Sequence, residues 1–261
     1  MRLVRLALHE ARYDEKVFWR DPQAVFFTVG LPLLYLFIFV TIFGDDVDRA
    51  YGLPVDVKAS TILVPGIVAI AIVSTAFQEL TIAIVQDRER GMLKRVRATP
   101  VPPVAFIAGH VLKSIATCVL LTVVLLVLGR AIWGVQIPTD TLPALALAVG
   151  VGAASLCCVA FAFTALVRRG TAAAPMAAAA ALTLFFISGN FFSVDNVPSW
   201  LSFTAGLFPV KHLNEALFTA LYPGTTGSGI EGRDLLVIAA WGAVALAVAV
   251  RRFRWTPSAL A

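Results

Sequence analysis

The sequence of 261 residues is strongly apolar, with 59% hydrophobic and 14% charged residues. Soluble domains average about 45–50% apolar and about 25% charged residues, so this composition excludes an ordinary soluble domain and favours a membrane protein. The formal net charge is +5. Because the basic residues stand in short clusters beside apolar blocks, we expect membrane lipids, and no nucleic acid, among the partners.

Residues 1–22 are predicted to form a cytoplasmic amphipathic helix that lies in the membrane interface. Its basic face carries residues at helical spacing: Arg5, His9, Arg12, Lys16 and Arg20. Pro22 is expected to end the helix, because a proline disfavours helix in the residue before it. The alternative is a charged leader without structure. Charges precede any apolar run and no small-residue cleavage site follows, so we do not expect a cleaved signal peptide.

The rest of the chain, residues 23–261, is predicted to be one all-α membrane domain with six spans. A bilayer core about 30 Å thick needs about 20 apolar residues in a helix. Six blocks meet this requirement: 23–43, 60–85, 104–129, 143–167, 172–192 and 235–253.

The segment between the second and third blocks, residues 86–103, is predicted to contain a short helix between two breaks. Gly91 can take the positive backbone angle that ends one helix, and Pro100 fixes the second break. Leu93 and Val96, three residues apart, would form an apolar knob pair. Basic side chains surround this pair: Lys94, Arg95 and Arg97. Such an element can insert into a groove on a soluble partner.

Three ionisable residues inside the apolar blocks are candidate functional residues, since charges in a bilayer are costly. Glu79 could face a water-filled cavity, contact a substrate or pair with Lys113 on the neighbouring span. Lys113 and His110 lie near the cytoplasmic end of the third block, and snorkelling to the interface also accounts for Lys113.

The segment between the fifth and sixth blocks, residues 193–234, is too long for a plain turn and too apolar for a disordered loop. We expect two short amphipathic helices that meet at Gly206 and Pro209 and dip into the outer leaflet. Backbone at such a break can lie at membrane depth only if it packs against protein or water.

The distribution of Lys and Arg predicts the orientation in the plasma (inner) membrane. These residues gather before the first block, in the loop 86–103, at Arg168 and Arg169, and after Val250. Positive charges concentrate on the cytoplasmic side of membrane proteins. Both termini are therefore expected in the cytoplasm.

The sequence shows no recognisable motif for catalysis or cofactor binding. A P-loop needs a glycine directly before its lysine, and the nearest candidate, Gly109 to Ser114, lacks it. The three cysteines lie within apolar blocks and suggest no disulfide framework or metal set: Cys118, Cys157 and Cys158. We therefore expect no catalytic residues, no metal and no cofactor bound by this chain.

Two stretches resemble a known family. The pattern Arg88-Glu89-x-Gly91-x-Leu93, followed by Ala98-Thr99-Pro100, is similar to the signature of type-2 ABC transporter permeases. That family includes daunorubicin-type drug exporters and exporters of lipids and polysaccharides. The outer-loop motif that runs from Pro209 to Leu217 also matches, as do the six spans and the amphipathic leader.

The resemblance implies a division of labour. Two permease copies, identical or paralogous, would face each other, and two copies of a separate nucleotide-binding subunit would hydrolyse ATP with Mg²⁺. The residues that it implies for coupling to the ATPase are Arg88, Glu89, Gly91, Leu93, Lys94, Arg95, Val96, Thr99 and Pro100. The outer-loop motif comprises Pro209, Lys211, His212 and Glu215. The alternative is that the loop charges only follow the positive-inside rule.

The expected function is export of a hydrophobic or amphipathic small molecule, with a drug or antibiotic as the leading cargo and a lipid or polysaccharide as the second. The direction of transport rests on the resemblance. An ion-coupled secondary transporter is the alternative of another class, but it would be expected to show paired intramembrane carboxylates, and only Glu79 is available.

Overall fold

The computed structural model describes residues 26–50, 59–98, 103–188 and 199–252, together with Arg20 and Pro22. This part of the chain is helical and contains no strand. In the first half the elements are η1 (Phe26–Gly30), α3 (Leu31–Ala50), α4 (Ala59–Ile72), η2 (Val73–Glu79), α5 (Leu80–Glu89), α6 (Met92–Arg97) and α7 (Pro103–Trp133). In the second half they are α8 (Leu142–Phe163), η3 (Gly170–Ala172), α9 (Ala173–Ile187), α10 (Ser199–Leu207), α11 (Pro209–Leu221) and α12 (Gly232–Arg252). The segments η1 and η2 are π-helical, and η3 is a 3₁₀ turn.

Five helices among the described residues are long and apolar enough to cross a membrane: Thr61–Glu89, Phe106–Trp133, Leu142–Phe163, Gly170–Ile187 and Gly232–Arg252. They coincide with the second to sixth predicted blocks. The first block contributes a shorter apolar helix, Thr28–Ile42. The predicted leader, apart from Arg20 and Pro22, lies outside the described residues, as do Thr99 and Pro100 of the predicted coupling loop.

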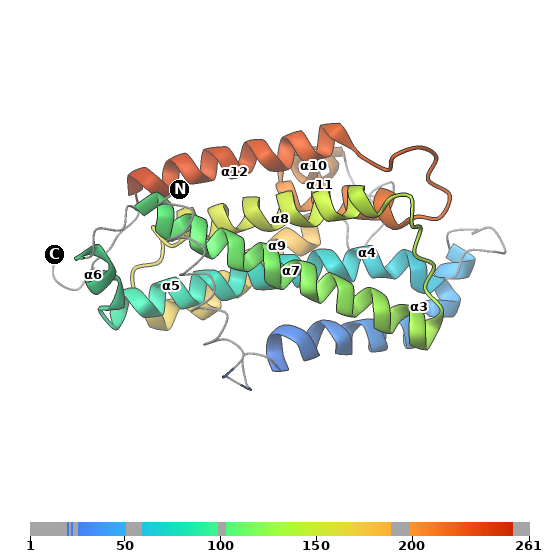
Figure 1. Cartoon of the computed structure of the whole chain (residues 1–261), viewed down its shortest axis with the longest axis horizontal. Helices are drawn as coiled ribbons and strands as arrows, with labels where there is room; N and C mark the ends of the chain where they lie inside the picture. Colours follow the sequence, from blue (N-terminus) through green and yellow to red (C-terminus); the bar gives the residue numbers. More distant parts are fainter. Residues whose placement is uncertain are drawn as a thin grey trace.

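The long helices run side by side along the long axis of the molecule, and α5 and α6 meet at one end (Figure 1). Arginines of two other segments reach the same end: Arg168 and Arg169 after α8, and Arg251 and Arg252 at the end of α12. This basic end is the one that the sequence predicts to face the cytoplasm.

Small side chains let α8 pack closely against its neighbours α12, α7 and α11. A side chain at Gly152 would overlap Leu213 of α11, and Gly242 of α12 lies directly against Ser155 of α8. The Ser155 hydroxyl donates a hydrogen bond to the Ile238 carbonyl at 2.7 Å. In lipid, where apolar side chains gain little by leaving the solvent, such close contacts hold helices together.

Helix α9 presents a narrow face of small residues to the protein. Ala173, Ala177 and Ala181 recur every four residues and are buried, whereas Leu182 and Phe186 are more than half exposed. This helix packs against η2, α5, α10 and α11. Phe185 is buried as well, but Leu182 and Phe186 point away from the protein, as expected for a helix in lipid or at an interface between subunits.

Two short helices occupy the segment before α12. They meet at Phe208, whose backbone is extended, and Pro209 begins α11. The apolar side of α11, including Leu213 and Leu217, is buried against α4, α8 and α12. In α10, by contrast, Phe203 is 79% exposed. The apolar side of α11 is thus covered by protein, and the placement of the pair in the outer leaflet stays a prediction.

Candidate functional site

The hairpin formed by α5 and α6 turns at Gly91. This residue has φ of +75°, and its N–H donates to the Arg88 carbonyl at 3.2 Å. No atom lies within 4 Å of the position that its Cβ would occupy, so the backbone angle, and not lack of space, favours glycine here. The predicted break and its positive angle are confirmed.

The apolar side of α6 faces the core of this chain, whereas a docking knob would be exposed to a partner. Leu93 is 1% exposed and belongs to the main apolar core, and Val96 packs against that core. The predicted outward knob pair therefore faces inward, because the chain's own core offers the nearest apolar surface. The exposed face of α6 consists of Met92, Lys94, Arg95 and Arg97.

Arg88 points into the protein instead of toward a partner. Its side chain is buried, and Nη1 donates to the Thr164 carbonyl at 3.0 Å while Nη2 donates to the Val167 carbonyl. Both acceptors lie just after α8, where carbonyls have no partner within the helix. A cation at this pole is favoured by the helix dipole, and each hydrogen bond to a charged group contributes about 1.5–3 kcal/mol.

Glu89 makes the complementary contact. Its carboxylate accepts a hydrogen bond from the N–H of Gly170, the first residue of the helix Gly170–Ile187. A carboxylate is favoured at the amino end of a helix for the same reason that a cation is favoured at the other end. A Cβ at position 170 would fall on the Glu89 carboxylate, so glycine leaves room for this bond.

Glu79 lies at the end of η2 and borders a cavity of about 640 Å³ between α3, the second span and α9. The Thr28 hydroxyl donates to its Oε1 at 2.7 Å, and Lys113 of α7 attracts the carboxylate electrostatically. Other polar side chains on the cavity wall are Tyr35, Ser74 and Gln78. The carboxylate is thus hydrogen-bonded to a residue of the first predicted span, and the positive charge of Lys113 acts on it electrostatically.

His110 has contacts typical of a structural residue. Its Nδ1 lies 3.0 Å from the Phe106 carbonyl one turn earlier, and its ring meets Phe161 of α8 edge-on at 5.6 Å. It does not line the cavity beside Glu79.

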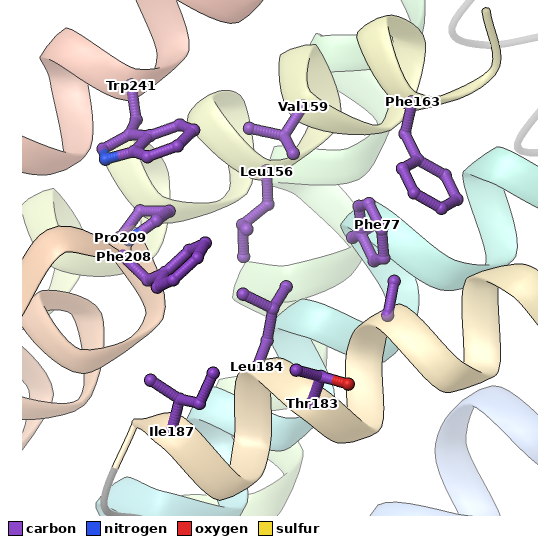
Figure 2. A pocket seen from close by; sticks show the side chains of 11 residues that line it. Phe77, Leu156, Val159, Phe163, Thr183, Leu184, Ile187, Phe208, Pro209 and Trp241 are labelled. Carbon is purple, nitrogen blue, oxygen red and sulfur yellow. The ribbon is translucent and has the colours of Figure 1, made fainter. Parts of the chain in front are cut away.

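A second cavity, of about 280 Å³, lies between η2, α8, α9, α11 and α12 (Figure 2). Aromatic rings stand at two of its sides: Phe77 and Phe163 at one, and Phe208 and Trp241 at another. Trp241 stacks on Phe208, and its Nε1 donates to the Leu207 carbonyl at 2.8 Å. The walls are almost entirely apolar, which suits a hydrocarbon group.

The outer-loop motif has one buried polar centre. His212 Nδ1 lies 2.8 Å from the Asp234 carboxylate, and Nε2 lies 2.9 Å from the Gly206 carbonyl. Each ring nitrogen thus faces an oxygen that can accept a hydrogen bond. This contact joins α10, α11 and α12. Sequence reasoning did not identify Asp234, 22 residues away from His212.

The other residues of that motif lie on the same helix. Glu215 is half-exposed, with its carboxylate 3.5 Å from Lys211 Nζ and 3.9 Å from His212 Nδ1. The atoms of His212, Glu215 and Asp234 that could ligate a metal ion lie within 4.8 Å of one another. Since the imidazole is already engaged at both nitrogens, we interpret the group as a structural contact between helices.

A comparison with family models matches residues 11–222 to the ABC-2 type transporter family. The match spans the α5–α6 hairpin, the α10–α11 pair and every element between them, and it ends before α12. No curated protein matches the chain. The family match over most of the sequence, in a protein built from long apolar helices, shows that this chain belongs to the ABC-2 type transporter family.

Proposed function

We propose that the chain is the permease subunit of an ATP-driven exporter in the plasma membrane, with six spans and both termini in the cytoplasm. Two copies, or this chain and a paralogue, surround the transport pathway, and a separate subunit, present twice, binds ATP and Mg²⁺. Membership of the ABC-2 family and the gathering of arginines at one end of the helices support this proposal.

The observation that carries the proposal is the exposed basic face of α6. Lys94, Arg95 and Arg97 stand on a six-residue helix whose inner side is fixed to the core by Leu93. A short helix with one charged side suits a groove with acidic edges on a soluble partner. The docking contacts are therefore assigned to these cations and Met92, while Leu93 and Val96 hold the helix in place.

The cargo is a hydrophobic or amphipathic compound, with a drug or antibiotic first and a lipid second. The cavity beside Glu79 combines apolar walls with a few polar groups, which is the usual composition of a site for small amphipathic ligands. A long polysaccharide would meet few hydrogen-bonding groups on such walls.

The test reverses the charge of the basic face. The double variant Lys94→Glu and Arg95→Glu should reach the membrane at the wild-type level and lose co-purification of the ATPase subunit, because like charges would face each other across the interface. Arg130→Glu, an exposed arginine at the far end of α7, is the matched control and should retain the partner. Normal co-purification of the double variant would refute the docking assignment.

A further inference from the structure

Helix α9 borders both cavities, as does η2. Ala178, Ala181, Leu182 and Phe185 line the cavity beside Glu79. On another side of the same helix, Ala180, Thr183, Leu184 and Ile187 line the apolar cavity (Figure 2). A small rotation or shift of α9 would change the shape of both cavities at once.

Two adjacent residues of the hairpin reach the two helix ends that meet at the basic end. Arg88 donates to carbonyls that follow α8, and Glu89 accepts from the first N–H of the helix Gly170–Ile187. Each charge has the sign that its helix pole favours. The hairpin is thereby bonded to the end of one span and to the beginning of the next.

The two attachments differ in strength. Arg88 is 2% exposed and bonds two carbonyls, and removing a buried charged donor leaves those groups unsatisfied. Glu89 is exposed and makes a single backbone contact with Gly170. The attachment to α8 is therefore the stronger one, and the attachment to α9 is the weaker one.

We propose that Arg88 and Glu89 are positioning residues that transmit movement of the hairpin to α9, and are not contacts for the ATPase. This proposal rests on the proposed function, because it takes the hairpin as the docking element. Arg88 keeps the hairpin in register with α8. Glu89 then carries a displacement of α6 to the start of α9, and hence to both cavities.

The test measures the distance between α6 and α9 in the intact complex of permease and ATPase subunit. Spin labels are placed at Ala98→Cys and Ala174→Cys, two exposed positions, while the three native cysteines are buried. The distance distribution is recorded without nucleotide and with ATP and vanadate. In the otherwise wild-type complex we expect one narrow distribution in both states, because the two elements move together.

The bond between Glu89 and Gly170 is then broken from each side. Glu89→Ala removes the acceptor, and Gly170→Ala pushes the carboxylate away. Each should broaden the distribution and make it differ between the two nucleotide states, with the ATPase subunit still bound. The double variant should be no worse than either single variant, since both remove one interaction. Gly150→Ala, at a glycine with open space around it, and Arg90→Gln, at the exposed neighbour of Glu89, should leave the distribution unchanged.

Two results would overturn the proposal. One is a narrow, wild-type distribution in both single variants. The other is loss of the ATPase subunit in Glu89→Ala, which would make Glu89 a docking contact. Failure of the proposed function is recognised separately, because it appears as normal co-purification in the Lys94→Glu, Arg95→Glu variant. Should the Glu89 variant be unstable, Gly170→Ala alone decides, since it leaves every charged side chain in place.

Discussion

Helix α6 and the α10–α11 pair are both short helical segments between long apolar helices, yet they are held in different ways. In α6 only Leu93 is fully buried, and the outer side carries cations. In α11 eight residues are buried, among them His212. Helix α6 is attached at a few points, whereas α11 is part of the core.

This difference separates an element that can move from one that fixes the fold. Regions with few buried apolar contacts open at low free energy, and core elements open only with the whole protein. An exposed, polar, loosely packed helix suits a partner that binds and pushes. A buried helix such as α11 suits a structural role in which it holds the spans together.

The largest expected effect comes from emptying the core around α11. Leu217 is fully buried, so Leu217→Ala should lower the free energy of unfolding by about 2–5 kcal/mol. Denaturant unfolding of the purified protein in detergent measures this. Leu207→Ala, at a leucine 58% exposed on α10, is the control and should change stability little. Equal losses in the two variants would show that α11 is not a core element.

The second-largest loss of stability is expected when the imidazole of His212 is removed. The variant His212→Ala leaves the Asp234 carboxylate, which is 9% exposed, without its described partner, at an expected cost of about 3 kcal/mol. The comparison variant is Glu215→Gln, at a half-exposed side chain, for which less than about 1 kcal/mol is expected. A stable His212→Ala protein would mean that apolar packing alone holds α11.

The smallest effect on global stability is expected for the hairpin. Leu93→Ala should cost no more than about 1 kcal/mol overall, because α6 can detach locally without unfolding the spans. The local detachment of α6 should appear as faster trypsin cleavage after Lys94 and Arg95. Met92→Ala, at the half-exposed neighbour, should be cleaved at the wild-type rate. If Leu93→Ala lowered the unfolding free energy as much as Leu217→Ala, the hairpin would be a core element too.

Much of this fold follows from patterns within short stretches of sequence. Block length predicts five of the long helices, since each block holds about 20 apolar residues. The turn at Gly91 follows from the glycine that starts a short basic helix. The break between α10 and α11 follows from Pro209, which cannot donate a backbone hydrogen bond.

The contacts of the candidate site could not be predicted in the same way, because they join residues far apart in the chain. Arg88 bonds carbonyls 76 and 79 residues later, and Glu79 accepts from Thr28, 51 residues earlier. Every residue has a backbone carbonyl, so the sequence does not show which carbonyls accept a hydrogen bond from Arg88. The direction of Leu93 and Val96 was wrong for a related reason, since their spacing shows that they share a face and not which surface covers it.

The π-helical stretch η2 in the second span changes how that span should be probed. A π-helix bonds to the fifth residue along the chain, so residues after Val73 fall out of phase with those before it. A helical wheel drawn from Thr61 at constant pitch would rotate Arg88 and Glu89 onto false faces. Accessibility scans of this helix therefore need two angular frames, one for Ala59–Ile72 and one for Leu80–Glu89.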